Sequence, residues 1–308
     1  MRRGSVAARR PQGWPGGCAV CQESRAGGTS MIVGKQFRMK RVVNEDGTCL
    51  ICALDHGMTS PTFLPPLADT AARLREAIRG GANVIMMSEG FARQTVMEYR
   101  KDVAWAMMLT ASATGSAVPN QIVHIGSVEE AAASGADAVV VFVALTGPEE
   151  ARMLEYVARV SEACRRWGIP FIAEAEYPTT YKAVEELQGE YGFDYLIRNA
   201  RLCAELGADI IKSNWPGDAR GFEKIVQATR LPTVLAGGPR ITDAELLQRM
   251  EAAMKAGGVG CSVGRNIFAH EHPEAMTRAL SRVIRERWPA KQALEELEEA
   301  LAARRRGP

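Results

Sequence analysis

The chain has 308 residues, of which 46% are hydrophobic and 24% are charged, and these values are typical of an ordinary globular protein. Its 38 basic and 36 acidic residues give a formal net charge of +2, which provides no overall electrostatic footprint for nucleic acid. No run of about 20 apolar residues occurs, so we expect no membrane span. We therefore expect a soluble, cytoplasmic protein with neither nucleic acid nor membrane as a partner.

Residues 1–30 differ from the rest of the chain. They contain five arginines and a single acidic residue among Gly, Pro and Ser, and they show no hydrophobic period. This composition favours disorder. A more ordinary sequence starts at Met31, which we expect to be the native start. We predict a disordered extension over residues 1–30, a main domain over residues 31–290, and a C-terminal helix and tail over residues 291–308.

Two cysteine pairs have the Cys-x-x-Cys spacing that zinc sites use, Cys18/Cys21 and Cys49/Cys52. The second pair lies in an apolar run that is typical of a buried strand. Residues three apart in a strand point to opposite faces, so Cys49 and Cys52 are poorly placed to bind one ion. We therefore expect buried thiols, no metal site and no cofactor.

From residue 48 onward, short apolar runs alternate with amphipathic stretches. The predicted strands are Cys49–Leu54, Asn83–Met87, Ala104–Thr110, Ala138–Leu145, Pro170–Ala175, Asp209–Lys212, Thr233–Leu235 and Val259–Val263. The predicted helices include Leu67–Arg79, Glu149–Trp167, Tyr195–Leu206, Gly221–Thr229 and Asp243–Ala256. Eight strands alternating with helices over about 240 residues predict an α/β fold, the (β/α)8 TIM barrel. A doubly wound open sheet is the alternative, but the first strand lacks a Gly-x-Gly-x-x-Gly turn.

The sixth predicted strand ends in a lysine, Lys212, directly after two isoleucines. Burying an ammonium without a partner is unfavourable. Either a carboxylate pairs with Lys212, or desolvation lowers its pKa and leaves a nucleophilic amine that is largely neutral at about pH 7–8. The alternative to both is a lysine that extends from the strand end into solvent.

Polar residues also stand at the ends of the first and fifth strands, where a barrel of this kind places its chemistry. Ile51, Ala53 and Asp55 share one face, so Asp55 can point into the barrel, although it could instead cap the next loop. His56 then lies on the opposite face and is a second-tier candidate. With Tyr177 after strand five, these strand ends supply a carboxylate, a phenol and an amine, the set that attack on a carbonyl with acid/base assistance needs.

Glycines follow strands seven and eight. Gly237 and Gly238 come after one strand, and Gly264 and Arg265 after the other. Glycines can expose backbone N–H groups to an anion, and an arginine adds a forked pair of donors. Loops at these two positions of a barrel commonly bind phosphate. The sequence therefore predicts a phosphate site there.

Four segments, taken in order, resemble the archaeal-type class I fructose-bisphosphate aldolases: Asp55-His56-Gly57, Lys212-Ser213-Asn214, Gly237-Gly238-Pro239 and Gly264-Arg265-Asn266-Ile267-Phe268. The wider family includes 2-amino-3,7-dideoxy-D-threo-hept-6-ulosonate synthase and the autoinducer-2-phosphate thiolases. The resemblance extends from about Met31 to Arg285.

This resemblance implies a role for each matching residue. Lys212 would form a Schiff base with the substrate ketone, and Tyr177 would be the acid/base group. Asp55 would assist proton transfer or orient the substrate hydroxyls. The residues that would hold the phosphate are Gly237, Gly238, Gly264 and Arg265.

The chain departs from the family around the tyrosine. Thr179 and Thr180 stand where arginine and glycine are usual, and Ala175 stands where the bisphosphate aldolases carry a tryptophan. Glu174 and Glu176 are additional acids that would repel a second phosphate, and Glu176 is a second-tier site residue.

We predict a metal-independent class I aldolase that acts on a phosphorylated ketose, similar to fructose-bisphosphate aldolase, with a phosphorylated sugar as substrate and a homo-oligomeric assembly. One alternative is the transaldolase-like heptulosonate synthase, which the stretch from Lys212 to Asp218 resembles. A phosphoketose thiolase, which Tyr177 argues against, and a barrel that binds a sugar phosphate without chemistry are further alternatives.

Overall fold

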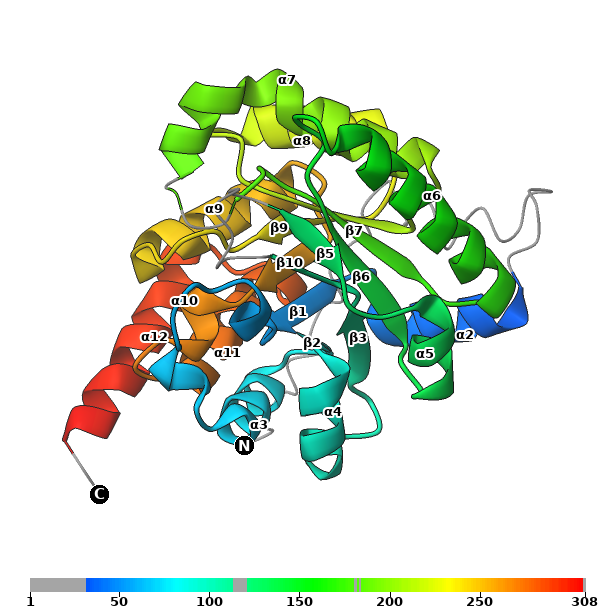
Figure 1. The fold of residues 1–308 in the computed structure, drawn as a ribbon. Helices are drawn as coiled ribbons and strands as arrows, with labels where there is room; N and C mark the ends of the chain where they lie inside the picture. The colour runs from blue at the N-terminus through cyan, green and yellow to red at the C-terminus, as the bar shows by residue number, and fades with distance from the viewer. Residues whose placement is uncertain (1–31, 113–120, 180–181, 183, 307–308) are drawn as a thin grey trace, which may run out of the picture.

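The eight predicted strands form a closed barrel of parallel strands (Figure 1). The computed structural model describes residues 32–112, 121–179, 182 and 184–306. The barrel strands are β1 (Cys49–Ala53), β2 (Val84–Met87), β3 (Ala104–Met108), β6 (Ala138–Val143), β7 (Phe171–Ala175), β8 (Ile210–Ser213), β9 (Thr233–Ala236) and β10 (Gly260–Val263). They follow one another in chain order, and β10 pairs with β1 to close the ring. The predicted TIM barrel is confirmed.

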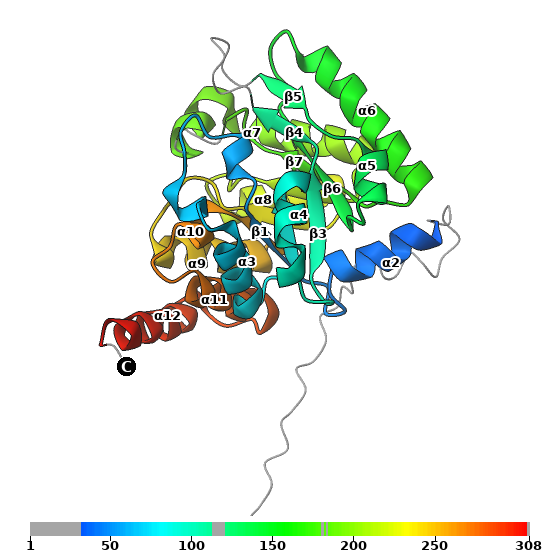
Figure 2. The same ribbon diagram turned by 60° about the horizontal axis from the view of Figure 1, so that its bottom comes forward.

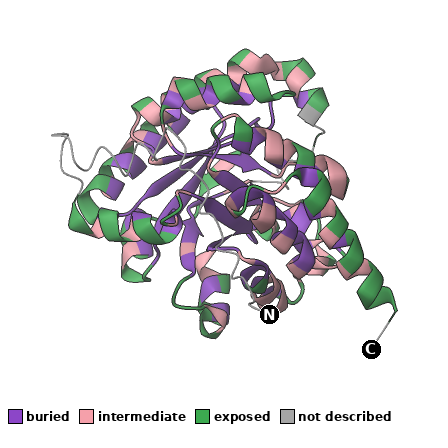
Figure 3. Ribbon diagram, turned by 180° about the vertical axis from the view of Figure 1, so that it is seen from behind, coloured by how far each residue is buried: buried purple, intermediate pink, exposed green. Residues whose placement is uncertain are grey.

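Helices cover the outside of the barrel (Figures 1 and 2). The α-helices that follow barrel strands are α3 (Thr70–Gly80), α4 (Glu89–Thr95), α5 (Val128–Ala133), α6 (Glu150–Trp167), α7 (Val184–Glu205), α8 (Ala219–Thr229), α9 (Asp243–Lys255), α10 (Arg265–Phe268) and α11 (Pro273–Arg285). The 3-10 helices are η1 (His56–Met58), η2 (Pro65–Leu67) and η3 (Val96–Glu98). In α6, an apolar stripe with Val157 and Cys164 is buried against the barrel, whereas the outward face is exposed (Figure 3). The helix ends at Trp167 and is capped by Gly168, whose φ of 64° glycine adopts without strain.

Successive residues of each strand face alternately the barrel interior and the helices. Ile51, Ala53 and Ile172 belong to one buried interior cluster, and the residues between them pack against the helices. Cys49 lies in the interior cluster and Cys52 in an outer one. The two thiols therefore lie on opposite faces of β1, as predicted.

The predicted third strand, Ala104–Thr110, is divided in the structure. β3 ends at Met108, and Thr110 begins β4 (Thr110–Ser112), which pairs antiparallel with β5 (Ile122–His124). The Thr110 Oγ1 atom accepts a hydrogen bond of 3.0 Å from the Phe142 N–H of β6. Because a side-chain oxygen takes the place of a backbone acceptor here, the backbone is able to leave the barrel and form the hairpin.

The amino ends of the strands are held by α2 (Val33–Val42). Lys35 Nζ lies 2.7 Å from Asp209 Oδ2, at the start of β8. The Asn83 side chain accepts a hydrogen bond from Leu50 N and donates one to the Val42 carbonyl. This end of the barrel is therefore built for stability. The predicted extension, residues 1–30, lies outside the described residues.

The last helix, α12 (Ala290–Arg305), packs on α9 and α11 and begins one residue before the predicted boundary. Leu297 is buried, and Arg282 of α11 donates to Glu296 at 2.9 Å. Within the described part of the chain, no helix combines the length and the apolar character that crossing a membrane requires.

Candidate active site

The carboxyl ends of β7 and β8 bring acidic and basic side chains together. Glu174 and Lys212 are register partners in these neighbouring strands. Each follows an interior residue, Ile172 or Ile210, by two positions and therefore faces the interior. Glu176 lies two residues beyond Glu174 and points the same way.

Lys212 is held between these two carboxylates. Its Nζ donates a hydrogen bond to Glu174 Oε1 and lies 2.9 Å from Glu176 Oε1. All three side chains are at most 10% exposed. Moving an isolated ammonium out of water costs several kcal/mol, and the two carboxylates offset that cost. Of the alternatives from the sequence, the structure selects the paired lysine.

The charge of Lys212 is stabilised by its surroundings. Burial by itself lowers the pKa of the ammonium, but the negative charges of Glu174, Glu176 and Asp55 outweigh this effect and raise the pKa above that of a free lysine. Of the two alternatives for a buried Lys212, this arrangement favours pairing with carboxylates over an amine that is already neutral at about pH 7–8. Lys212 needs a neighbouring base to take its proton before it can attack a carbonyl.

Asp55 stands at the end of β1, above Ala53 of the interior cluster, where the sequence placed it. Burial raises the pKa of this carboxyl to about 6, and the positive charge of Lys212 opposes the increase. Within the described part of the chain, its Oδ1 atom is buried without a hydrogen-bond partner. We call Asp55, Glu174, Glu176 and Lys212 the lysine cluster.

His56 lies between the lysine cluster and the loop after β10. The chain turns into η1 at this point, so strand alternation no longer applies, and Nδ1 of His56 is 3.6 Å from Asp55 Oδ1. The ring packs edge-on against Phe268 with centroids 5.0 Å apart. Burial, followed by the charges of Arg265 and Lys212, lowers the pKa of His56 to about 3. The imidazole is therefore neutral at neutral pH.

Tyr177 is placed differently from the prediction. It is fully buried in the outer cluster with Ala173 and Ala175, stacked on Tyr195 at a centroid distance of 6.0 Å. Its hydroxyl donates to the Gly192 carbonyl at 3.5 Å, and burial raises its pKa to about 12. Since Glu174 and Glu176 face inward, strand alternation turns the tyrosine outward. The Tyr177 hydroxyl therefore lies on the outer side of β7, away from the lysine cluster, and the acid/base role that the resemblance implies for it stays a prediction.

Two asparagines that the sequence did not identify as site residues fix Glu176. Asn214 Nδ2 donates to Glu176 Oε2 at 3.1 Å, while its Oδ1 accepts the Tyr177 N–H at 2.7 Å. Asn199 Nδ2 donates to the Glu176 carbonyl at 3.1 Å. Glu176 follows the last residue of β7, and these bonds hold it where strand pairing has ended. Asn214 belongs to one of the four segments that resemble the aldolase family, but its hydrogen-bond partners could not be predicted from the sequence.

The two glycine loops lie side by side because Asn266 joins them. Its Nδ2 donates to the carbonyls of Gly237 and Pro239, each at 3.0 Å, and its Oδ1 accepts the Ile241 N–H at 3.0 Å. Gly238 has a φ of 60°, which favours glycine. The Gly237 N–H donates to the Ser262 carbonyl at 3.1 Å, so this donor is not available to an anion. The predicted role of Gly237 in binding phosphate stays a prediction, to which this N–H does not contribute.

Gly264 permits the close approach of the first and last strands. A Cβ atom at this position would lie 2.1 Å from His56 Cε1 and 2.8 Å from the Ala53 carbonyl oxygen, so no larger residue fits without a shift. Arg265 begins α10 and is half-buried, and its charge contributes to the low pKa of His56. The guanidinium therefore lies on the same side of the barrel as the lysine cluster.

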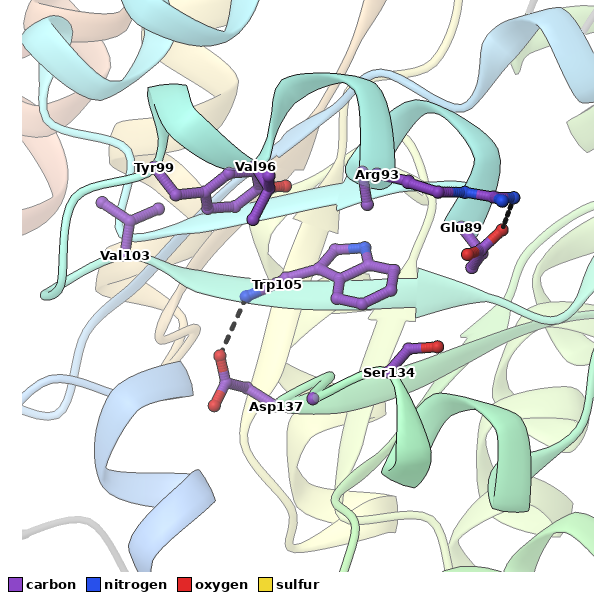
Figure 4. A pocket seen from close by; sticks show the side chains of 10 residues that line it. Glu89, Arg93, Val96, Tyr99, Val103, Trp105, Ser134 and Asp137 are labelled. Carbon is purple, nitrogen blue, oxygen red and sulfur yellow. Dashed lines mark hydrogen bonds and ion pairs between the residues drawn. The ribbon is translucent and has the colours of Figure 1, made fainter.

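A cavity of about 460 Å³ lies elsewhere, on the outer wall of the barrel between α4, β3 and the start of β6 (Figure 4). Trp105 points into it, with the Arg93–Glu89 ion pair at one end and Asp137 below. Its lining contains neither the lysine cluster nor the glycine loops. In the described ranges, no group of three or more His, Cys, Asp and Glu residues is arranged to hold a metal ion.

Comparison with known families identifies relatives along most of the chain. The profile of the DeoC/LacD family of aldolases matches residues 49–270. The chain is 33% identical over 251 residues to 2-amino-3,7-dideoxy-D-threo-hept-6-ulosonate synthase of Halobacterium salinarum, an alignment that covers 82% of this chain and 91% of the relative. It is 30% identical over 258 residues to 2-amino-4,5-dihydroxy-6-oxo-7-(phosphonooxy)heptanoate synthase of Streptomyces griseus, covering 81% and 90%.

Solved structures of aldolases have the same fold. An archaeal fructose-1,6-bisphosphate aldolase, with its catalytic lysine covalently bound to the carbinolamine intermediate of the substrate, superposes with a TM-score of 0.71 at 26% identity. The alignment covers 81% of this chain and 99% of that one. Another structure of an archaeal fructose 1,6-bisphosphate aldolase also gives a TM-score of 0.71, at 25% identity.

Proposed function

The chain belongs to the DeoC/LacD family of aldolases, and on this premise we propose that it cleaves and forms a C–C bond of a phosphorylated ketose through a Schiff base on Lys212. The observation that carries the proposal is the position of Lys212. It is the one lysine in the described part of the chain that lies at the carboxyl end of a barrel strand, in contact with two buried carboxylates.

The proposed reaction starts from the amine of Lys212. A neutral Lys212 attacks the ketone carbon, water leaves, and the resulting iminium withdraws electrons from the bond to be cleaved. Cleavage needs a base for the proton of the substrate hydroxyl and an acid for the carbon that remains. Carboxylates of the lysine cluster stand within reach of the imine nitrogen and can supply both.

The polar atoms of the site favour a hydroxylated substrate at its reacting end. Asp55 Oδ1 is a buried acceptor without a hydrogen-bond partner among the described residues, whereas Glu176 Oε1 faces the Lys212 ammonium at 2.9 Å. A substrate hydroxyl would satisfy the Asp55 atom, and leaving such an atom unpaired is unfavourable. We assign the substrate phosphate to Gly238, Gly264 and Arg265, in the two loops that Asn266 joins.

A second candidate is the transaldolase-like reaction of a heptulosonate synthase. The carboxyl groups of Glu174, Glu176 and Asp55 surround the one ammonium of Lys212 and contribute negative charge to the reacting end of the site wherever they are ionised. This charge disfavours a bisphosphate whose second phosphate approaches Lys212. The heptulosonate-synthase names of the sequence relatives point in the same direction.

An activity screen tests the proposal. The purified enzyme is given fructose 1,6-bisphosphate, a mono-phosphorylated ketose and a deoxy-ketose phosphate, and release of the aldehyde is measured with and without EDTA. We expect turnover of at least one of them, no effect of EDTA, loss of turnover in Lys212→Met, and normal turnover in Lys255→Met, a control on the exposed face of α9. Turnover that survives Lys212→Met would contradict the proposal.

A further inference from the structure

The mouth of the barrel carries charges on one side and lacks them in the strands of the other. Asp55, Glu174 and Lys212 stand at the carboxyl ends of β1, β7 and β8, and Arg265 follows β10. In contrast, β3 and β6 and the segments that continue them, residues 104–123 and 138–148, contain no Asp, Glu, Lys or Arg. A substrate that spans the mouth therefore meets two sides of different chemistry.

Phe142 is the inward-facing residue at the carboxyl end of β6. It follows Val140 of the interior cluster by two positions, and its register partner is Glu174, which in turn pairs with Lys212. The three side chains therefore stand on neighbouring strands at one level of the barrel. Phe142 is 6% exposed, close to the 8% of Lys212, and it belongs to none of the apolar clusters among the described residues. Its ring borders the lysine cluster instead of completing the core.

The backbone that carries this ring is fixed on both sides. The Phe142 N–H donates to Thr110 Oγ1 at 3.0 Å, and the carbonyl of Val143 accepts a hydrogen bond of 2.8 Å from Asn199 Nδ2. An apolar ring on a fixed strand end presents one defined surface to a substrate, and such rigid positions are suited to selection between ligands.

The order of the strands places Phe142 across the barrel from the proposed phosphate site. β6 is four strands from β10 in either direction around the ring of eight. The phosphate is assigned to Gly264 and Arg265 after β10, and the ketone carbon to Lys212 on β8, which lies between β10 and β6. A ketose held at these two points directs its remaining carbons toward β6 and the ring of Phe142.

We propose that Phe142 is a specificity-determining residue, which accepts an uncharged end of the substrate and rejects a second phosphate. This inference rests on the proposed Schiff-base function of Lys212 and on the proposed phosphate site. A phosphate against the ring would lose water without gaining a donor from β6, and this loss is unfavourable. The C–H groups of an uncharged end gain from burial against the same surface.

One cation lies at the outside of this strand end. Arg198 of α7 donates to the Leu145 carbonyl at 3.4 Å, and its charge is paired with Glu150 of α6. Leu145 itself packs in the outer cluster. The guanidinium therefore serves contacts between the helices and the strand end, and the inner face at Phe142 keeps its apolar character.

A matched pair of ketoses tests the inference, because fructose 1-phosphate and fructose 1,6-bisphosphate differ only in the second phosphate. Each is mixed with the enzyme over a range of concentrations, the imine is reduced with borohydride, and the adduct on Lys212 is measured by mass spectrometry. The readout is the ratio of the two half-saturating concentrations, expressed as open-chain ketose. The adduct with dihydroxyacetone phosphate, which lacks the three distal carbons, measures the fraction of competent sites in each preparation.

Wild type should bind fructose 1-phosphate more tightly than the bisphosphate. In Phe142→Ala we expect this preference to fall at least about tenfold, the lower range for the change of one group in a pocket, because water can enter and keep the second phosphate hydrated. Phe142→Tyr keeps the ring and adds one donor, so the preference should fall about fivefold without an opened space. Val141→Ala is the matched control, since its side chain packs in the outer cluster, and its ratio should stay within about twofold of wild type.

The outcomes separate this inference from the proposed function. If wild type binds the two ketoses equally, if neither Phe142 variant changes the ratio, or if Val141→Ala lowers it as much as Phe142→Ala, the role of Phe142 is overturned while the Schiff base stands. Should Phe142→Ala contain no competent sites, Phe142→Tyr decides alone. If wild type forms no adduct with any of the three ketoses, the proposed function itself fails.

Discussion

Glu176 and Tyr177 are neighbours in the chain, yet they belong to different regions of the molecule. On the inner side of β7, carboxylates surround a buried ammonium. On the outer side, Tyr177 packs with Tyr191 and Tyr195 in an aromatic group between β7 and α7. The inner side holds groups that can exchange protons near neutral pH, whereas the outer phenol has a pKa raised to about 12. Facing direction, more than residue type, decides which of the two can take part in the chemistry.

The largest effect should come from removing the positive charge of the inner side. Lys212→Met should abolish turnover and also lower the free energy of unfolding by about 3–5 kcal/mol, because Glu174 and Glu176 remain buried without their cation. Urea denaturation measures the loss. The double variant Lys212→Met/Glu174→Gln should recover part of this stability, and equal stability of the two variants would contradict the electrostatic account.

Removing a carboxylate should change the dependence of stability on pH. The pKa of Asp55 is raised to about 6 in the folded protein, above its ordinary value, so the folded state binds the extra proton between about pH 4 and 6. Stability therefore falls as pH rises through this window, by up to about 3 kcal/mol for a shift of about two units. Asp55→Asn should flatten the fall and be more stable than wild type at pH 7. Chemical denaturation at several pH values measures this, and an unchanged slope would contradict it.

Removing the hydrogen bonds that hold Glu176 should have a smaller effect on stability and turnover. Asn214→Ala leaves the Tyr177 N–H without its acceptor and one oxygen of Glu176 without its donor. Unpaired buried groups cost about 1–3 kcal/mol, so we expect a loss of stability in this range together with lower turnover. Asn44→Ala is a control at a less buried asparagine, where no change in turnover is expected.

The smallest effect should come from the outer side. Tyr177→Phe removes one long hydrogen bond to the Gly192 carbonyl and keeps the aromatic packing. We expect a loss of less than about 1 kcal/mol in the free energy of unfolding. Thermal unfolding measures the loss, and steady-state assays should show unchanged kcat and KM. A large fall in kcat would indicate that Tyr177 takes part in the reaction and would contradict this expectation.

Much of the fold could be predicted because local sequence patterns indicate where the strands lie. The apolar runs placed all eight barrel strands, and the alternation along Ile51, Ala53 and Asp55 placed that carboxylate correctly. The hairpin of β4 and β5 was missed because the Thr110 side chain replaces a backbone acceptor, a contact that no periodicity reveals.

The candidate site was predicted less completely. The register that pairs Glu174 with Lys212 joins residues 38 positions apart, so the sequence does not show that these two residues are partners. A signal for the direction of Tyr177 was nevertheless present, since it alternates with Glu174 and Glu176 along one strand. The role of Asn266 depends on which loops the barrel brings together and could not be found from the chain alone.

The central claim is that Lys212, on the inner side, is the residue that carries the substrate. The most direct measurement is peptide mapping of the enzyme after reduction with borohydride in the presence of dihydroxyacetone phosphate. The account predicts a single adduct, on the peptide that contains Lys212, in wild type and in Tyr177→Phe alike. An adduct on a different lysine, or none with any ketose phosphate, would contradict it.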